Sequence, residues 1–94
     1  MSGCRIEITG RAGREIAAIA RGDRRRAVAI RDAVLALAQD PRPDRCRKVS
    51  GPFDLNRIRA ASYRIIYRVA DGTVTITVVR VAHRGEVRTG LDRL

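Results

Sequence analysis

Residues 63–69 read Tyr-Arg-Ile-Ile-Tyr-Arg-Val, and this alternation predicts a β-strand whose two faces differ in chemistry. The odd-numbered residues, which include both tyrosines, point to one side. The even-numbered residues, Arg64, Ile66 and Arg68, point to the other side. If helices cover the tyrosine face, two arginines stand on the open face of a sheet.

Strand-like sequence continues on both sides of this stretch. Asp71-Gly72 is a favoured pair for a tight hairpin turn, and residues 73–82 are rich in the β-branched residues of a return strand. Before residue 63 the chain is strand-like from Phe53 onward, and Arg57 and Arg59 share one side of that strand. The three strands predict an antiparallel meander.

The N-terminal half predicts one strand and two helices. Residues 5–9 alternate with a period of two, and Gly10 then breaks the strand. Apolar residues follow a helical period from Arg11 up to Gly22, and Asp23 can cap a second helix. That helix stops at Asp40-Pro41. Residues 42–52, which hold Pro43, Gly51 and Pro52, read as a loop.

The resulting element order is β-α-α-β-β-β. We expect an α+β fold, in which an N-terminal strand, a helical hairpin and a three-stranded antiparallel meander form one sheet with the helices on one face. A chain of 94 residues has room for a single domain, residues 1–94.

Charge is the strongest signal in the composition. Twenty basic residues, of which 19 are arginine, face ten acidic ones and give a net charge of +10. This favours a nucleic-acid partner, although the preference for arginine over lysine is also typical of a GC-rich genome. No signal peptide or membrane-length apolar stretch occurs, so we expect a cytoplasmic protein. Cys4, Cys46 and His83 fit no metal-ligand spacing, so neither a metal nor a cofactor is expected.

Several basic side chains are expected to converge on the open face of the sheet. Such a cluster repels itself unless an anion occupies it, which is the physical case for a phosphate-binding groove. The alternative is a solvated outer face. The predicted RNA-binding residues are Arg45, Arg47, Lys48, Arg57, Arg68 and Arg80.

Four motifs occur in a specific order. They are Asp-Pro-Arg-Pro at 40–43, Leu-Asn-Arg-Ile-Arg at 55–59, the stretch 63–69, and Val-Ala-His-Arg-Gly-Glu-Val at 81–87. In this order the chain resembles the RelE/ParE superfamily of toxins from type II toxin–antitoxin systems, RelE more than ParE. The resemblance runs from about Arg5 to Arg88.

The resemblance implies a metal-independent endoribonuclease that cleaves messenger RNA in the ribosomal A site, with the 2′-hydroxyl of the RNA as nucleophile. Preorganised guanidinium groups would stabilise charge on the phosphoryl oxygens, and His83 could move a proton. Arg88 stands where ribonuclease members commonly carry a tyrosine. The candidate catalytic residues are Arg59, Arg64, His83, Arg84 and Arg88.

The resemblance also implies partners: a cognate antitoxin, the ribosome with its messenger RNA, and operator DNA bound through the toxin–antitoxin complex. Two other functions stay open. One is a ParE-like poison of DNA gyrase, and the other is a non-toxic binding module of the same fold.

Overall fold

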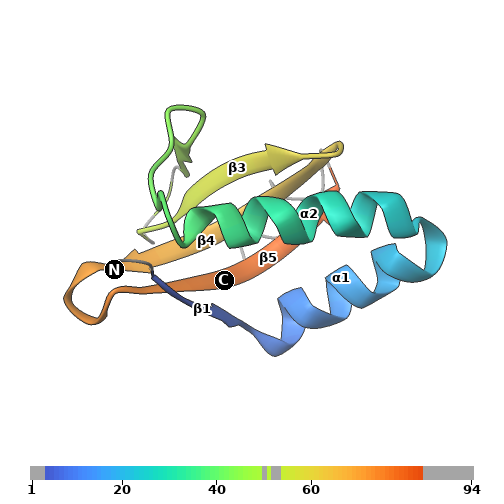
Figure 1. Cartoon of the computed structure of the whole chain (residues 1–94), viewed down its shortest axis with the longest axis horizontal. Coiled ribbons are helices and arrows are strands. Elements are labelled where there is room, and N and C mark those ends of the chain that lie inside the picture. Colours follow the sequence, from blue (N-terminus) through green and yellow to red (C-terminus); the bar gives the residue numbers. More distant parts are fainter. Residues whose placement is uncertain (1–3, 50, 52–53, 84–94) are drawn as a thin grey trace.

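The computed structural model describes residues 4–49, 51 and 54–83, which form one sheet and two helices (Figure 1). The strands are β1 (Arg5–Ile8), β2 (Arg47–Lys48), β3 (Asn56–Ala60), β4 (Tyr63–Ala70) and β5 (Thr75–His83). The helices are α1 (Gly10–Gly22) and α2 (Arg24–Leu37), and a short 3-10 helix, η1, spans Asp71–Thr73. The predicted α+β class is confirmed. No helix within the described ranges is long and apolar enough to cross a membrane.

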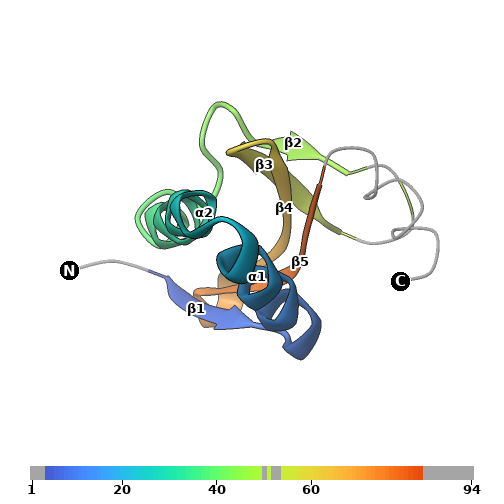
Figure 2. The same cartoon turned by 90° about the vertical axis from the view of Figure 1, so that its right-hand side faces the viewer.

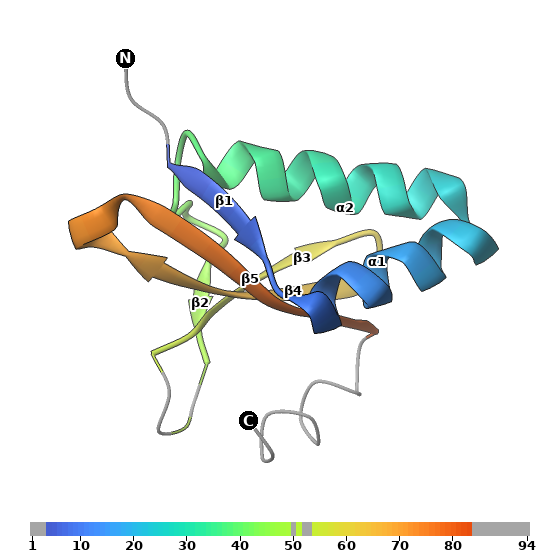
Figure 3. The ribbon, with the colours of Figure 1, turned by 90° about the horizontal axis from the view of Figure 1, so that it is seen from below.

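The five strands lie in the order β1-β5-β4-β3-β2. The strands β3, β4 and β5 form the predicted antiparallel meander, and β1 joins its β5 edge in parallel. Both helices cover the same face of the sheet, as Figure 2 shows. Figure 3 shows β1 beside β5 and β2 at the opposite edge. The other face of the sheet carries no helix in the described part of the chain; we call it the open face.

The helix starts are fixed by side-chain caps. Thr9 Oγ1 accepts a 3.1 Å hydrogen bond from the Ala12 N–H and donates to the Val79 carbonyl oxygen, so α1 starts against β5. Helix α1 therefore begins at Gly10, one residue before the predicted start. Asp23 caps α2 by accepting from the Arg26 N–H at 3.2 Å, as predicted.

The main core lies between the helices and the covered face of the sheet. Ile65, Tyr67 and Val69 of β4 are buried in it, which confirms the predicted side of the odd-numbered residues. Helix α2 packs its apolar stripe against them and ends at Leu37, three residues before Asp40. The other buried members of this core are Ala12, Ile30, Ala33, Val34, Leu37, Ile58, Ile76, Val78 and Val81.

A second, smaller cluster lies on the open face. Ile66 is fully buried there with Leu55 and Ala82, and Val49 and Val79 pack against them. The open face is therefore not a continuous array of arginines, because an apolar patch divides it.

Two connections differ from the sequence-based prediction. Asp71-Gly72 does not form a two-residue hairpin turn, because η1 and Val74, with φ +52°, connect β4 to β5. The return strand consequently starts at Thr75 and reaches His83. The segment expected to be only a loop contains β2, whose residues Arg47 and Lys48 pair with β3. The predicted strand start at Phe53 lies outside the described residues.

One irregularity sets which residues of β5 face the helices. Tyr67 is opposite Val78, but its neighbour Ile66 is opposite Arg80, so Val79 is an extra residue in a β-bulge. Before the bulge the even-numbered residues of β5 face the core. After the bulge the odd-numbered residues do so, as the buried Val81 shows.

Candidate nucleic-acid interface

The open face carries its arginines in rows that run across the strands. Arg59 of β3 is directly opposite Arg64 of β4, and Arg64 is in turn opposite Ala82 of β5. The neighbours Ile58 and Ile65 point into the main core, so Arg59 and Arg64 point away from it. Like charges placed directly opposite each other destabilise a sheet. This pair is therefore a place where an anion would be stabilising.

The adjacent row extends the basic surface to the β2 edge. Arg47 is opposite Arg57, and Arg57 is opposite Ile66. Arg57 and Arg64 are half-buried, whereas Arg59 and Arg68 are exposed. Arg68 lies on the same face as Arg64 but on the far side of buried Ile66. The structure thus brings Arg47, Arg57, Arg59 and Arg64 together and separates Arg68 from them by the apolar patch.

A hollow of about 300 Å³ lies at the β2–β3 edge, lined by Arg45, Arg47, Arg57, Arg59 and Ile58. Arg45 Nη1 donates to the carbonyl oxygen of Arg59 at 2.9 Å, and Arg47 Nη1 donates to the Asp44 carbonyl at 2.8 Å. These contacts fix two guanidinium groups at the rim and leave donors over for an anion.

Lys48 is engaged elsewhere. Its ammonium group forms a hydrogen bond and ion pair with Asp54, which holds the pKa of that carboxyl below its ordinary value. Both side chains are exposed, so this pair contributes little to stability. Lys48 faces Asp54 and is not one of the residues that line the hollow.

Tyr67 anchors the loop that carries Arg45 and Arg47. Its hydroxyl lies 2.8 Å from the Pro41 carbonyl oxygen and 3.2 Å from Cys46 Sγ. Burial raises the pKa of this hydroxyl, and the contact with Cys46 adds to the shift. A side chain of the core thereby holds both ends of the turn, residues 41–46, at the edge of the basic surface.

Arg80 does not belong to this surface. Arg80 is only 5% exposed. Its guanidinium group donates to Glu15 Oε2 on α1, from Nη2 at 3.1 Å and from Nε at 3.3 Å. The same carboxylate accepts a hydrogen bond from the Val81 N–H. Arg80 was predicted to bind RNA, but these contacts make it a link between α1 and β5.

His83 lies on the opposite side of the sheet from the arginine pair. It is directly opposite Tyr63, and the two rings meet edge to face with centroids 5.3 Å apart. Tyr63 packs against the helix-side core, so His83 shares that side. The structure therefore separates His83 from Arg59 and Arg64, with which it was grouped. Arg84 and Arg88, the other two candidate catalytic residues, lie outside the described residues.

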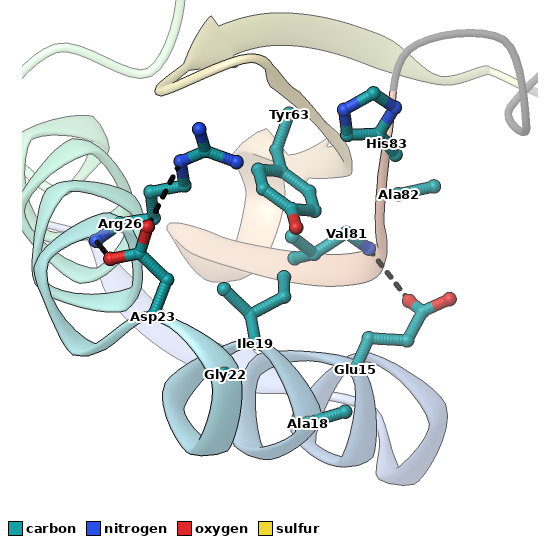
Figure 4. A pocket seen from close by; sticks show the side chains of 10 residues that line it. All are labelled: Glu15, Ala18, Ile19, Gly22, Asp23, Arg26, Tyr63, Val81, Ala82 and His83. Atoms are coloured by element: carbon teal, nitrogen blue, oxygen red, sulfur yellow. Dashed lines mark hydrogen bonds and ion pairs between the residues drawn. The ribbon is translucent and has the colours of Figure 1, made fainter.

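The sequence did not predict the larger hollow, of about 660 Å³, that lies between α1, the start of α2 and the ends of β4 and β5 (Figure 4). Tyr63 and His83 stand on its sheet side, and Ile19, Asp23 and Arg26 on its helix side. The place of Tyr63 follows from the alternation of residues 63–69. The bulge that turns Val81 and His83 toward the helices has no signature in the sequence.

The arginine pair and its neighbours can bind a phosphate and stabilise negative charge on it. Within the described ranges no histidine, carboxylate or tyrosine accompanies Arg59 and Arg64 in their rows on the open face. No group of three or more potential metal ligands occurs in the part of the chain that the structure describes, where both cysteines are free thiols.

Comparisons with known proteins give a consistent family. A search of curated proteins found no match. Among solved structures, the RelBE2 toxin–antitoxin complex from Mycobacterium tuberculosis is 21% identical, covers 87% of this chain and 99% of its own, and has a TM-score of 0.74. A mutant of the Escherichia coli toxin RelE is 22% identical over 100% and 99% of the two chains, with a TM-score of 0.74. The archaeal RelE–RelB complex from Pyrococcus horikoshii is 26% identical over 89% and 98%, with a TM-score of 0.67.

The family model described as "ParE toxin of type II toxin-antitoxin system, parDE" matches residues 6–88. This range includes every described strand and helix except the first residue of β1. The chain therefore belongs to the ParE toxin family of type II toxin–antitoxin systems.

Proposed function

We propose that this toxin acts on RNA as a ribosome-dependent endoribonuclease that cleaves messenger RNA and thereby stops translation. The observation that carries the proposal is the direct opposition of Arg59 and Arg64 on the open face, next to Arg57 and Arg47 in the adjacent row. Four guanidinium groups on neighbouring strands form a positively charged surface that suits a phosphate backbone rather than a small neutral ligand.

The proposed chemistry begins with attack of a ribose 2′-oxygen on the adjacent phosphorus. The bond from phosphorus to the 5′-oxygen breaks, which leaves a 2′,3′-cyclic phosphate on one fragment and a 5′-hydroxyl on the other. Arg59 and Arg64 would stabilise the charge that accumulates on the phosphoryl oxygens, with no metal ion or cofactor. The 2′-hydroxyl proton must pass to a base and a proton must reach the leaving oxygen. An arginine is a poor base at its ordinary pKa, so the arginines are assigned to charge stabilisation and not to these proton transfers.

We also propose a cognate antitoxin as partner. Two similar structures are toxin–antitoxin complexes, from Mycobacterium tuberculosis and Pyrococcus horikoshii. This chain has a net charge of +10, so an antitoxin segment that covers the open face should be acidic. Its apolar residues would meet the Leu55, Ile66 and Ala82 patch. Binding to operator DNA would come from the complex.

A second function, poisoning of DNA gyrase, is favoured by the family model that matches residues 6–88, because that model carries the ParE description. In this alternative the same arginines would bind without cutting.

The deciding experiment is inducible expression of the chain alone in bacteria, with messenger RNA ends mapped at nucleotide resolution within minutes. New ends inside reading frames, in phase with codons and absent in an Arg64→Ala variant, would support the ribonuclease. Intact messages together with DNA damage signalling would move the protein to the gyrase poisons. Normal growth after induction would indicate a non-toxic binding module of the same fold.

A further inference from the structure

We propose that the hollow between the helices and the end of the sheet receives a base of the same RNA strand whose phosphates bind the open face. The ligand is a nucleobase with an exocyclic amino group, splayed out beside Tyr63 and His83. This inference rests on the proposed RNA-directed function and adds a site that reads the substrate. Three features of the structure carry it.

The first feature is the closeness of the two surfaces at one end of the sheet. Tyr63 and Arg64 are consecutive residues on opposite faces of β4, and their partners on β5, His83 and Ala82, are consecutive too. The step from the arginine pair to the hollow is therefore one residue along the strand. An RNA strand bound through a phosphate at Arg59 and Arg64 needs to pass only the rim of the sheet to bring its next base to Tyr63.

The second feature is the chemistry of the hollow. Its volume of about 660 Å³ is in the range of small-ligand sites. The Tyr63 and His83 rings are perpendicular, so they offer one aromatic face and one edge, and His83 is exposed. Ile19 and Val81 supply apolar surface, and Figure 4 shows the Tyr63 hydroxyl directed toward them. Unstacked RNA bases bind to such aromatic side chains.

The third feature is the distribution of charge. Glu15 and Asp23 line the hollow, and both carboxylates already have cationic partners, Arg80 and Arg26. Because Arg80 and Arg26 neutralise these carboxylates, the hollow has no surplus positive charge to attract a phosphate, whereas the amino group of a base can donate to the carboxylate oxygens. The carboxylates inside the hollow therefore select for a base.

Beyond the hollow the surface becomes basic again. Arg26 stands on its helix rim, and Arg21, Arg24 and Arg25 are exposed around the turn from α1 to α2. Figure 1 places this turn at the same end of the molecule as the β3–β4 turn. The order along the rim is arginine pair, aromatic hollow, arginine cluster. A nucleic-acid strand presents the same order of phosphate, base and phosphate.

The test is an abasic scan of RNA binding by the full chain. Ten-nucleotide single strands of 2′-O-methyl RNA, which attack through the 2′-hydroxyl cannot cleave, are titrated by fluorescence anisotropy. Each nucleotide in turn is replaced by an abasic one. We expect one position at which loss of the base weakens binding by roughly tenfold, because stacking on aromatic side chains contributes an effect of that order per base. Tyr63→Leu and His83→Ala should each reduce this penalty toward onefold.

Arg26→Ala and Arg31→Ala form a matched pair of controls for charge. Both arginines are exposed on α2, and each forms an ion pair at 3.2 Å, with Asp23 and Asp32 respectively. We expect Arg26→Ala to weaken binding and to alter the abasic penalty, because Arg26 lines the hollow. Arg31→Ala removes the same charge outside the hollow and should leave the penalty unchanged.

The outcomes separate this inference from the proposed function. If Arg64→Ala binds RNA as tightly as the parent, the RNA-directed function itself fails. If Arg64→Ala weakens binding but the abasic penalty is absent, or is the same in His83→Ala and Tyr63→Leu, only the base site is wrong. Unchanged RNA binding with loss of antitoxin binding in those two variants would assign the hollow to a polypeptide and would overturn the proposal.

Discussion

The carboxylate of Glu15 accepts a 2.7 Å hydrogen bond from the Val81 N–H, at the part of β5 that extends beyond the end of β1. A helix side chain thus completes the hydrogen bonding that a neighbouring strand would otherwise provide. The same carboxylate neutralises Arg80, whose side chain is 6% exposed. One residue of α1 therefore fixes both the edge of the sheet and a buried charge.

Replacing Glu15 should destabilise the fold markedly. In Glu15→Ala the Arg80 guanidinium stays buried without its partner, and we expect a loss of about 2–4 kcal/mol in the free energy of unfolding, since the pair is partly open to solvent. Glu7→Ala is the control, because its ion pair with Arg5 is exposed and should contribute less than about 0.5 kcal/mol. Urea unfolding measures the loss of stability in each variant. A loss in Glu15→Ala no larger than that in Glu7→Ala would show that the Glu15 contacts do not stabilise the fold.

The arginine pair should matter for function and not for folding. Arg64→Ala and Arg59→Ala each remove one phosphate contact, so the slope of log K against log salt for RNA binding should fall by about one. Toxicity on induction should fall strongly, whereas the thermal midpoint should stay within a few degrees. The same effect is predicted for Arg84→Ala from the family resemblance. Full toxicity in a folded Arg64→Ala protein would refute the site.

Tyr67 should give the fold a dependence on alkaline pH. Burial and the Cys46 contact raise the pKa of its hydroxyl in the folded state. The stabilisation is therefore complete below the unfolded pKa of about 10 and is lost as the pH rises from there toward the folded value. Comparing urea unfolding at pH 8 and pH 10.5 should show a larger loss for the parent than for Tyr67→Phe. At pH 8 the phenylalanine variant should be weaker by about 1–2 kcal/mol, because the Pro41 carbonyl loses its donor. Parallel behaviour of the two proteins would exclude this role for the hydroxyl.

The β3–β4 turn offers a stabilising substitution. Ala61 and Ser62 have φ values of +50° and +71°, which are the left-handed angles that a two-residue hairpin turn requires and that asparagine and glycine adopt at low cost. We expect Ser62→Gly and Ala61→Asn each to raise the free energy of unfolding by about 0.5–1 kcal/mol. Gly72→Ala is the comparison, because Gly72 does not need a left-handed conformation and has space around its Cα. A loss of stability in Ser62→Gly would contradict the turn geometry.

Much of the fold could be predicted because local chemistry decided it. The period of residues 63–69 identified the covered face of β4, and Asp23 marked the boundary between the helices. Strand alternation across residues 60–62 also predicted that Arg57 and Arg59 could lie beside Arg64 and Arg68. The structure pairs Arg59 with Arg64 but sets Arg57 opposite Ile66. At these residues the local sequence favours a single conformation, so the pattern alone was enough to predict the structure.

The features that the sequence did not predict came from contacts between segments distant in sequence. Strand β2 has only two residues, too few for any periodicity, and it exists because Arg47 and Lys48 pair with Arg57 and Asn56. Arg80 was expected beside RNA because alternation cannot reveal that Glu15, 65 positions away, lies within reach of its guanidinium. His83 was placed with the arginines because the extra residue in β5 changes nothing in the hydrophobic pattern before it.

That extra residue, Val79, divides β5 into two halves that obey opposite rules of orientation. The half next to β1 shows its even-numbered side chains to the helices, and the half next to the arginine pair shows its odd-numbered ones. Deleting Val79 would restore a uniform strand in which Val81 and His83 still face the helices. A strand that kept Val79 in regular alternation would instead bring Ala82 over the helices and turn His83 outward beside Arg64. One extra residue thus reverses the face of the sheet to which each later residue of β5 points. It decides which chemistry each side of the protein presents without altering any other residue.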